Sequence, residues 1–173
     1  MKKEKEKKKM KWLFQLIDDS KVLWSASNGG HVGVVEKILE VVGINVNVVI
    51  SGATALYQAS YNGHLAIVKV LIKAGGNVNQ ATTTGASPLY IASEKGNVAI
   101  VKVLIEAGGD VNQHTHKNTT PLNKASYKGH TEIVRLLLQQ PNIDLNKIAG
   151  GKSALGHATN NEIVQLLTNA GAQ

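Results

Sequence analysis

Two histidines spaced two residues apart are the first candidates for chemistry in this sequence. His114 and His116 lie in the segment His-Thr-His-Lys, and alternate side chains of an extended segment point to the same side. Two imidazoles on one side could begin a zinc or nickel site, but such sites need further ligands and the sequence shows no third one. The chain has no cysteine, which excludes thiolate metal sites, disulfides and cysteine nucleophiles. We therefore predict no metal and interpret His114 and His116 as exposed recognition residues.

The segment Gly-Gly-Lys-Ser at 150–153 resembles the end of a phosphate-binding loop. Such a loop needs a glycine five residues before its final glycine, where this chain has Asn146, and an apolar strand should precede it. Neither requirement is met, so we interpret the segment as a turn followed by a helix N-cap. No Ser/His/Asp set stands apart, and acids such as Glu106 and Glu132 are scattered. The sequence predicts no catalytic residue, no cofactor and no enzyme activity.

Three other histidines, each preceded by glycine, indicate a repeated structure. His31, His64 and His130 each follow a glycine, and Asn97 takes the same position in the copy between the last two. All four positions are separated by a period of 33 residues. A fixed period of this length is typical of stacked repeat architectures, so we interpret these histidines as structural rather than metal-binding.

Each repeat contains signals for two short helices. Hydroxyl side chains suited to cap a first helix recur at Thr54, Ser87, Thr120 and Ser153, and Pro88 and Pro121 follow two of them. The buried face of the first helix is predicted to carry Leu23/Ala26, Leu56/Ala59, Leu89/Ala92, Leu122/Ala125 and Leu155/Ala158. That of the second helix is predicted to begin with Val34-Val35, Ile67-Val68, Ile100-Val101, Ile133-Val134 and Ile163-Val164. Glycines end both helices.

The pattern resembles the ankyrin repeat over roughly residues 18–173. It combines a capped Pro-Leu start, an Ala, a Gly-His, an Ile-Val pair, a Leu and a Gly-x-x-Val-Asn turn. The resemblance implies an all-α ankyrin-repeat solenoid of stacked helix-turn-helix units with β-hairpin-like connecting turns. One departure recurs, because the family's histidine after Pro-Leu is replaced throughout. The residues in its place are Trp24, Tyr57, Tyr90, Asn123 and Gly156.

We divide the chain at composition changes and repeat starts. Residues 1–11 form a predicted disordered polybasic tail, and 12–50 hold an N-terminal capping helix and the first repeat. Further repeats are predicted at 51–83, 84–116 and 117–150, followed by a truncated C-terminal capping repeat at 151–173. The tail carries seven lysines and two glutamates, so it accounts for most of the net charge of +7.

Tail-driven binding to nucleic acid or an anionic membrane through residues 2–11 is therefore the alternative function, with the repeats as scaffold. A third possibility is a targeting subunit of a larger enzyme. The sequence shows no signal peptide and no membrane-spanning run, so we expect a cytoplasmic protein, with the nucleus as the other intracellular location.

The leading hypothesis, implied by the resemblance, is a monomeric adaptor that binds a partner protein through the concave face of the stack. Tyr61, Ile91 and Tyr127 are predicted to be exposed there. Lysines make the third and fourth repeats basic, which favours an acidic or mixed-charge partner. The candidate partner-binding residues are Gln58, Tyr61, Asn62, Thr83, Ile91, Glu94, Lys95, His114, His116, Lys117, Lys124, Tyr127 and Lys128. The family also implies asparagine hydroxylation at Asn112, which lies eight residues after Leu104; the simpler interpretation is that Asn112 shapes the turn.

Overall fold

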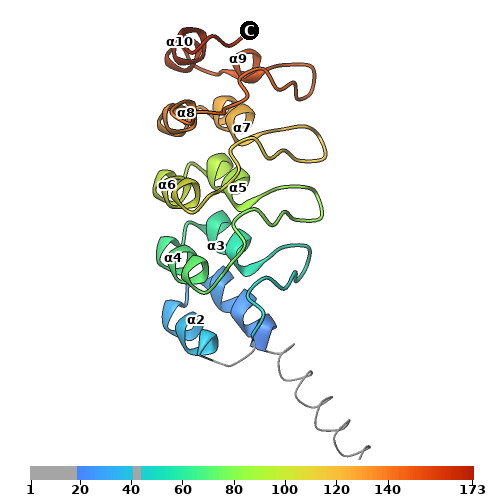
Figure 1. Ribbon diagram of the computed structural model, residues 1–173, viewed down its shortest axis with the longest axis vertical. Coiled ribbons are helices and arrows are strands. Elements are labelled where there is room, and N and C mark those ends of the chain that lie inside the picture. Colours follow the sequence, from blue (N-terminus) through green and yellow to red (C-terminus); the bar gives the residue numbers. More distant parts are fainter. Residues whose placement is uncertain (1–18, 41–43) are drawn as a thin grey trace, which may run out of the picture.

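The computed structural model describes residues 19–40 and 44–173, and within them the chain is a single column of stacked helix pairs (Figure 1). Residues 19–29 are helical and precede α2. The helices that follow are α2 (Val32–Leu39), α3 (Ala55–Asn62), α4 (Leu65–Lys73), α5 (Pro88–Lys95), α6 (Val98–Glu106), α7 (Pro121–Lys128), α8 (Thr131–Leu138), α9 (Ala154–His157) and α10 (Asn161–Asn169). In these residues no strand forms, and isolated antiparallel bridges close two hairpin tips, at Ile50–Ala53 and Ala149–Lys152. The expected all-α solenoid is confirmed.

The predicted tail at 1–11 and the first part of the predicted unit 12–50, residues 12–18, lie outside the described residues. Among the helices that are described, none has both the length and the apolar content needed to cross a bilayer.

The first helices α3, α5, α7 and α9 begin directly after their predicted caps, Thr54, Ser87, Thr120 and Ser153. The side-chain oxygens of Thr54 and Ser87 each accept a hydrogen bond of 3.1 Å from the backbone N–H three residues on. Thr120 does the same at 3.2 Å, and Asn123 completes a capping box by accepting from the Thr120 N–H at 3.0 Å. Gly63, the residue after α3, has the left-handed φ of 81° that ends the helix.

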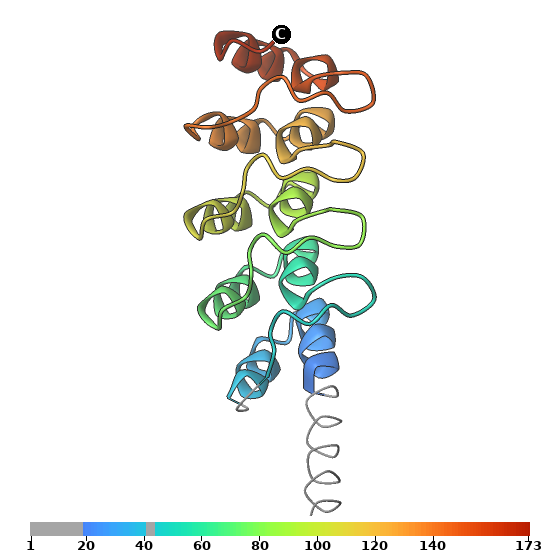
Figure 2. The same cartoon turned by 45° about the vertical axis from the view of Figure 1, so that its right-hand side comes forward.

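Two layers build the column, as both views show (Figure 2). First helices α3, α5, α7 and α9 contact each other in order, and second helices α2, α4, α6, α8 and α10 do the same. The core lies between the layers. Its fully buried members include Leu56, Ala59, Leu89, Ala92, Leu122 and Ala125 from first helices, and Ile67, Val68, Leu71, Ile100, Val101, Leu104, Ile133, Val134 and Leu137 from second helices.

At the ends of the column, some side chains of the predicted buried faces are exposed or only partly buried. Val34 on α2 is 45% exposed and Val164 on α10 is 38% exposed. Leu155 and Ala158, at the last first helix, are only partly buried. In the central repeats the same positions are covered by a neighbour on each side. The terminal repeats have a described neighbour on one side only, so the outward-facing apolar side chain stays exposed.

Hydrogen bonds between repeats explain the recurring histidines. The His64 Nε2 lies 3.2 Å from the Asn28 carbonyl oxygen, and the His130 Nε2 lies 3.0 Å from that of Glu94. Asn97, which replaces the histidine in the copy between them, donates from Nδ2 to the Ser60 carbonyl at 2.9 Å. Each of these three side chains thus bonds to the first helix of the preceding repeat, which confirms the structural interpretation for His64 and His130.

Asparagines link the turns at the other end of each repeat. The Asn79 Nδ2 donates to the Gly108 carbonyl at 3.0 Å, and its Oδ1 accepts from the Asp110 N–H at 2.8 Å. Asn112 repeats the arrangement, with its amide held by the Asn142 carbonyl and the Asp144 N–H. Asn112 therefore shapes the turn, and its modification stays a prediction.

Candidate functional site

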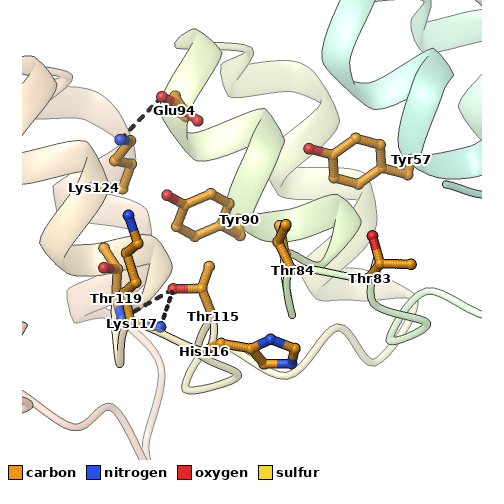
Figure 3. A pocket seen from close by; sticks show the side chains of 11 residues that line it. Tyr57, Thr83, Thr84, Tyr90, Glu94, Thr115, His116, Lys117, Thr119 and Lys124 are labelled. Atoms are coloured by element: carbon orange, nitrogen blue, oxygen red, sulfur yellow. Dashed lines mark hydrogen bonds and ion pairs between the residues drawn. The ribbon is translucent and has the colours of Figure 1, made fainter. Parts of the chain in front are cut away.

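The hairpins and the first helices share one face of the column, which we call the hairpin face. It comprises α3, α5, α7, α9 and the hairpin segments 48–54, 80–87, 113–120 and 146–153. A cavity of about 610 Å³ lies on this face between the hairpin tips and the first helices, and we call it the groove (Figure 3). Its lining residues are Tyr57, Thr83, Thr84, Ala86, Tyr90, Glu94, Thr115, His116, Lys117, Thr119 and Lys124.

Backbone contacts between successive hairpins hold the outer wall of the groove. The Thr83 N–H donates to the Gly52 carbonyl at 3.2 Å, and the His116 N–H donates to the Thr84 carbonyl at 3.1 Å. Gly85 allows the second contact. Its φ is +83°, and a Cβ placed on it would lie 2.9 Å from the His116 backbone nitrogen. The first three hairpin segments are therefore joined into one wall rather than standing as separate loops.

Two tyrosines lie side by side in the interior of the groove. Tyr57 and Tyr90 occupy the same position in successive repeats, and Figure 3 shows their hydroxyls directed toward the lysine side. Burial raises the pKa of Tyr57 to about 12, and the nearby Glu94 charge adds to this effect. Burial also raises the pKa of Tyr90, although Lys124 acts in the opposite direction. Both hydroxyls are thus protonated donors at neutral pH.

An ion pair borders the groove beside Tyr90. The Lys124 Nζ lies 3.0 Å from the Glu94 Oε1, and both side chains are less than one quarter exposed, at 22% and 24%. Burial alone would lower the pKa of Lys124, but the hydrogen bond to Glu94 and the further interactions with Tyr90 and the Glu94 charge outweigh burial, so its pKa is raised. Lys124 therefore stays charged at neutral pH and is held in a fixed direction.

A second cavity of about 250 Å³ adjoins the groove where the fourth repeat meets the fifth. Lys117, Thr119 and Lys124 line both cavities, so the two lie next to each other along the hairpin face. Tyr127 and His157 close the second cavity with an edge-to-face ring contact, with 6.1 Å between ring centroids.

Exposed aromatic and cationic side chains lie on the first helices beside the groove. Tyr61 and Tyr127 are 40% and 55% exposed, as predicted. The Lys95 Nζ lies 4.1 Å from the Tyr61 ring centroid, and the Lys128 Nζ lies 5.8 Å from that of Tyr127. We call Tyr61, Lys95, Tyr127 and Lys128 the exposed row. The Lys124 Nζ also lies 5.8 Å from the Tyr127 ring centroid, so both exposed rings are accompanied by cations.

The structure brings only some of the predicted binding residues together. Thr83, Glu94, His116, Lys117 and Lys124 line the groove. Gln58 and Asn62 lie at the other end of the face, where both bond to Asn28, Gln58 at 2.6 Å. His114 is exposed but lines neither cavity, and its Nδ1 lies 3.1 Å from the Thr115 carbonyl oxygen.

The prediction that Ile91 is exposed is wrong, because its side chain is only 3% exposed. Ile91 lies on α5, which has the first helices α3 and α7 packed against it on its two sides. The same position holds Gln58 in α3 and Lys124 in α7, which are partly exposed and bond through their polar ends to Asn28 and Glu94. An apolar side chain at this position is instead enclosed between neighbouring helices, so Ile91 contributes to packing and not to a binding surface.

Sequence reasoning missed the groove's own lining. Tyr57, Tyr90, Thr84, Thr115 and Thr119 were not among the predicted binding residues. A usable signal was present, since Tyr57 and Tyr90 replace the family histidine at successive repeats. Hydroxyl residues are also concentrated in the hairpin segments at 82–84 and 119–120.

Charge is divided unevenly between the two faces of the described chain. The hairpin face as defined above holds six lysines, Lys95, Lys117, Lys124, Lys128, Lys147 and Lys152, and one acidic side chain, Glu94. The helix at 19–29, which lies outside that definition, adds Lys21 and Asp19, whose charges balance. The second helices and their following turns hold five cations and seven acids. The cations there are Lys37, Lys69, Lys73, Lys102 and Arg135, and the acids are Glu36, Glu40, Glu106, Asp110, Glu132, Asp144 and Glu162. The hairpin face is therefore the positively charged side.

Within the described ranges, no group of three or more His, Cys, Asp or Glu side chains is arranged to hold a metal ion. The segment at 150–153 forms the bridged turn between Ala149 and Lys152, followed by the Ser153 cap of the four-residue helix α9. It is a hairpin tip, as interpreted from the sequence.

Comparison with known proteins agrees with this architecture. The family model for ankyrin repeats, which describes three copies of the repeat, matches residues 22–115 and residues 108–173. A search of curated proteins found no match.

Proposed function

This chain belongs to the ankyrin repeat family, and we propose that it is a non-enzymatic adaptor that binds a partner protein through its hairpin face. Repeats of this family are generally protein–protein interaction modules. The observation that carries the proposal is the exposed row lying directly beside the groove. Tyr61 and Tyr127 are large, rigid and exposed, and neither belongs to the buried core. Aromatic side chains of this kind are enriched among the residues that dominate binding energy.

The rest of the hairpin face supports the same proposal. Its hydrogen-bonded hairpins and capped helices are formed before a partner arrives, which limits the ordering cost of binding. An interface of ordinary size needs about 800 Å² from each protein, an area that several neighbouring repeats supply. The positive charge of this face favours an acidic or mixed-charge partner. We expect a monomer in an intracellular compartment.

Affinity capture with paired variants tests the proposal. One bait carries Tyr61→Ala and Tyr127→Ala, and the matched control carries Lys69→Ala and Lys102→Ala, two exposed lysines on the second helices α4 and α6. We expect the tyrosine variant to weaken partner binding by about tenfold or more, and the control to leave it within about twofold. Equal losses in both variants, or none in the tyrosine variant, would place the interface elsewhere.

A third bait that lacks residues 1–11 separates this proposal from tail-driven binding. The proposal requires the partner to remain bound when the tail is removed. A partner lost only with the tail would favour the alternative of nucleic-acid or membrane binding by residues 2–11.

A further inference from the structure

We propose that the groove receives a carboxylate side chain from an acidic, extended segment of the partner, held between Lys117 and Lys124 beside the Tyr90 hydroxyl. This inference rests on the proposed function and gives the chemistry of the segment that binds. The site lies where the groove and the second cavity meet, because Lys117 and Lys124 line both.

The two lysines line the same part of the groove from different elements. Lys117 extends from the third hairpin, and Lys124 extends from α7 (Figure 3). Their side chains approach Tyr90 from the same side, and the Tyr90 hydroxyl is directed toward them. A group placed there would contact two ammonium groups and a phenol, so it would meet hydrogen-bond donors on several sides.

The charge at this point is only partly compensated. Glu94 pairs with Lys124 at 3.0 Å, which fixes the lysine's position and neutralises one charge. In the described part of the chain no acidic side chain forms an ion pair with Lys117, and the hairpin segments contain no acidic residue at all. One positive charge therefore remains available in the groove, and an anion from the partner would complete a four-charge network with Lys117, Lys124 and Glu94.

The neutral hydroxyls of the lining can donate to an acceptor, and the charged groups decide which partner group fits. Tyr57 and Tyr90 keep their protons, and Thr115 and Thr119 add further hydroxyls. A guanidinium or ammonium group from the partner would meet two lysines, and Glu94 is already paired. A carboxylate is therefore the side-chain group that the lining fits best.

The shape indicates an extended segment rather than a single exposed residue. The groove spans the second to fourth repeats, and the second cavity continues it to the Tyr127–His157 pair. A chain crossing both cavities would pass the lysine pair near its middle. Lys95 and Lys128, which also form no ion pair among the described residues, lie beside this path and would attract further acidic residues.

A designed peptide probe tests this assignment with no need for the natural partner. The probe is a short, fluorescently labelled peptide in which glutamates alternate with alanines, and its matched control has every glutamate replaced by glutamine. We expect the glutamate peptide to shift the amide resonances of Lys117, Thr119 and Lys124, and the glutamine peptide to leave them unchanged. Affinity should fall by about tenfold between about 0.05 M and about 0.5 M salt, since exposed charge pairs are screened.

Single variants then locate the contact. Lys117→Ala should weaken glutamate-peptide binding about fivefold or more, and Lys102→Ala on α6 should leave it within about twofold. Because Lys117 is exposed, its replacement leaves the fold intact, and Lys124→Gln provides a second, less severe variant. Equal binding of both peptides, resonance shifts centred on second-helix lysines, or equal effects of Lys117→Ala and Lys102→Ala would overturn the inference. Tighter binding of the same peptide with phosphoserine, by more than about tenfold, would replace carboxylate with phosphate.

The outcomes of the two proposals remain separable. If the peptide does not bind but the partner is still lost from the Tyr61→Ala, Tyr127→Ala variant, the hairpin face remains the interface and only the carboxylate site fails. If the peptide binds the lysine pair but the natural partner does not depend on Tyr61 and Tyr127, the proposed function fails.

Discussion

At the scale of single residues, one position in the repeat serves two different purposes. Asn123 is buried, accepts from the Thr120 N–H at 3.0 Å and donates to the Lys147 carbonyl at 3.1 Å, so it ties a first helix to the next hairpin. Tyr57 and Tyr90 occupy the same position in the two preceding repeats and line the groove. Where the fourth repeat has an amide that links helix and hairpin, the second and third repeats have tyrosines that a partner can contact.

The protonation of Tyr57 gives a prediction at this scale. Its pKa is raised in the folded protein from 10.0 to about 12. Below pH 10 both folded and unfolded chains keep the proton, and between pH 10 and about 12 only the unfolded chain releases it. Stability contributed by this proton is therefore complete below pH 10 and is lost as the pH rises toward 12.

Urea denaturation of the native protein and of Tyr57→Phe, from about pH 9 to about pH 11, measures this contribution. As the pH rises, we expect the unfolding free energy of the native protein to fall relative to that of Tyr57→Phe. Lysines titrate in the same range but are common to both proteins, so their effect cancels. A difference that stays constant over this range would show that Tyr57 is no more protected from ionisation in the folded chain than in the unfolded one.

At the scale of elements, the sequence predicted more about the helices than about the surface between them. The caps at Thr54, Ser87 and Thr120 and the glycine that ends α3 follow from local chemistry, and the structure confirms them. The exposure of Ile91 was predicted wrongly because the repeat period gives equivalent positions, here Gln58, Ile91 and Lys124, the same predicted exposure. Whether a side chain there reaches solvent depends on its length and polarity and on the two helices packed beside it.

The groove was missed for a related reason. Its walls come from three repeats, and the lining tyrosines and threonines meet only when successive hairpins pack together. The spacing of 33 residues predicts that equivalent positions align along the stack, but it does not give the distance between a hairpin tip and the next first helix.

Substitution of two glycines with similar φ angles tests whether the hairpins pack in close backbone contact. Gly85 has φ +83°, and a Cβ on it would lie 2.9 Å from the His116 backbone, whereas Gly108 has φ +85° and open space within 4 Å of the same point. Gly108→Ala should cost about 1–2 kcal/mol for the left-handed backbone alone. Gly85→Ala should cost a further 1–3 kcal/mol or so because the backbone of the next hairpin must move. Chemical denaturation of the two variants gives both values, and equal costs would mean that the hairpin contact is not tight.

At the scale of the whole molecule, stability should be graded along the column. The central repeats are covered on both sides, whereas the last first helix, α9, has four residues and Val164 on α10 is 38% exposed. Because each repeat contacts only its neighbours, stability in such a stack is a sum of local terms.

Native-state hydrogen exchange measures this gradient directly. We expect the slowest exchange in α5 and α6 and faster exchange in α9 and α10, reflecting fraying from the C-terminal repeat. Uniform protection from α3 to α10 would show instead that the described column unfolds as one unit.

The measurement that tests the central claim most directly is site-specific photocrosslinking to a bound partner. A photoreactive side chain is placed in separate variants at Tyr61 and Tyr127 on the hairpin face, and at Lys69 and Lys102 on the second helices. All four positions are exposed, so each variant should fold. Binding through the hairpin face requires crosslinks from Tyr61 and Tyr127 and none from Lys69 or Lys102. Crosslinks from the second-helix positions alone would contradict it.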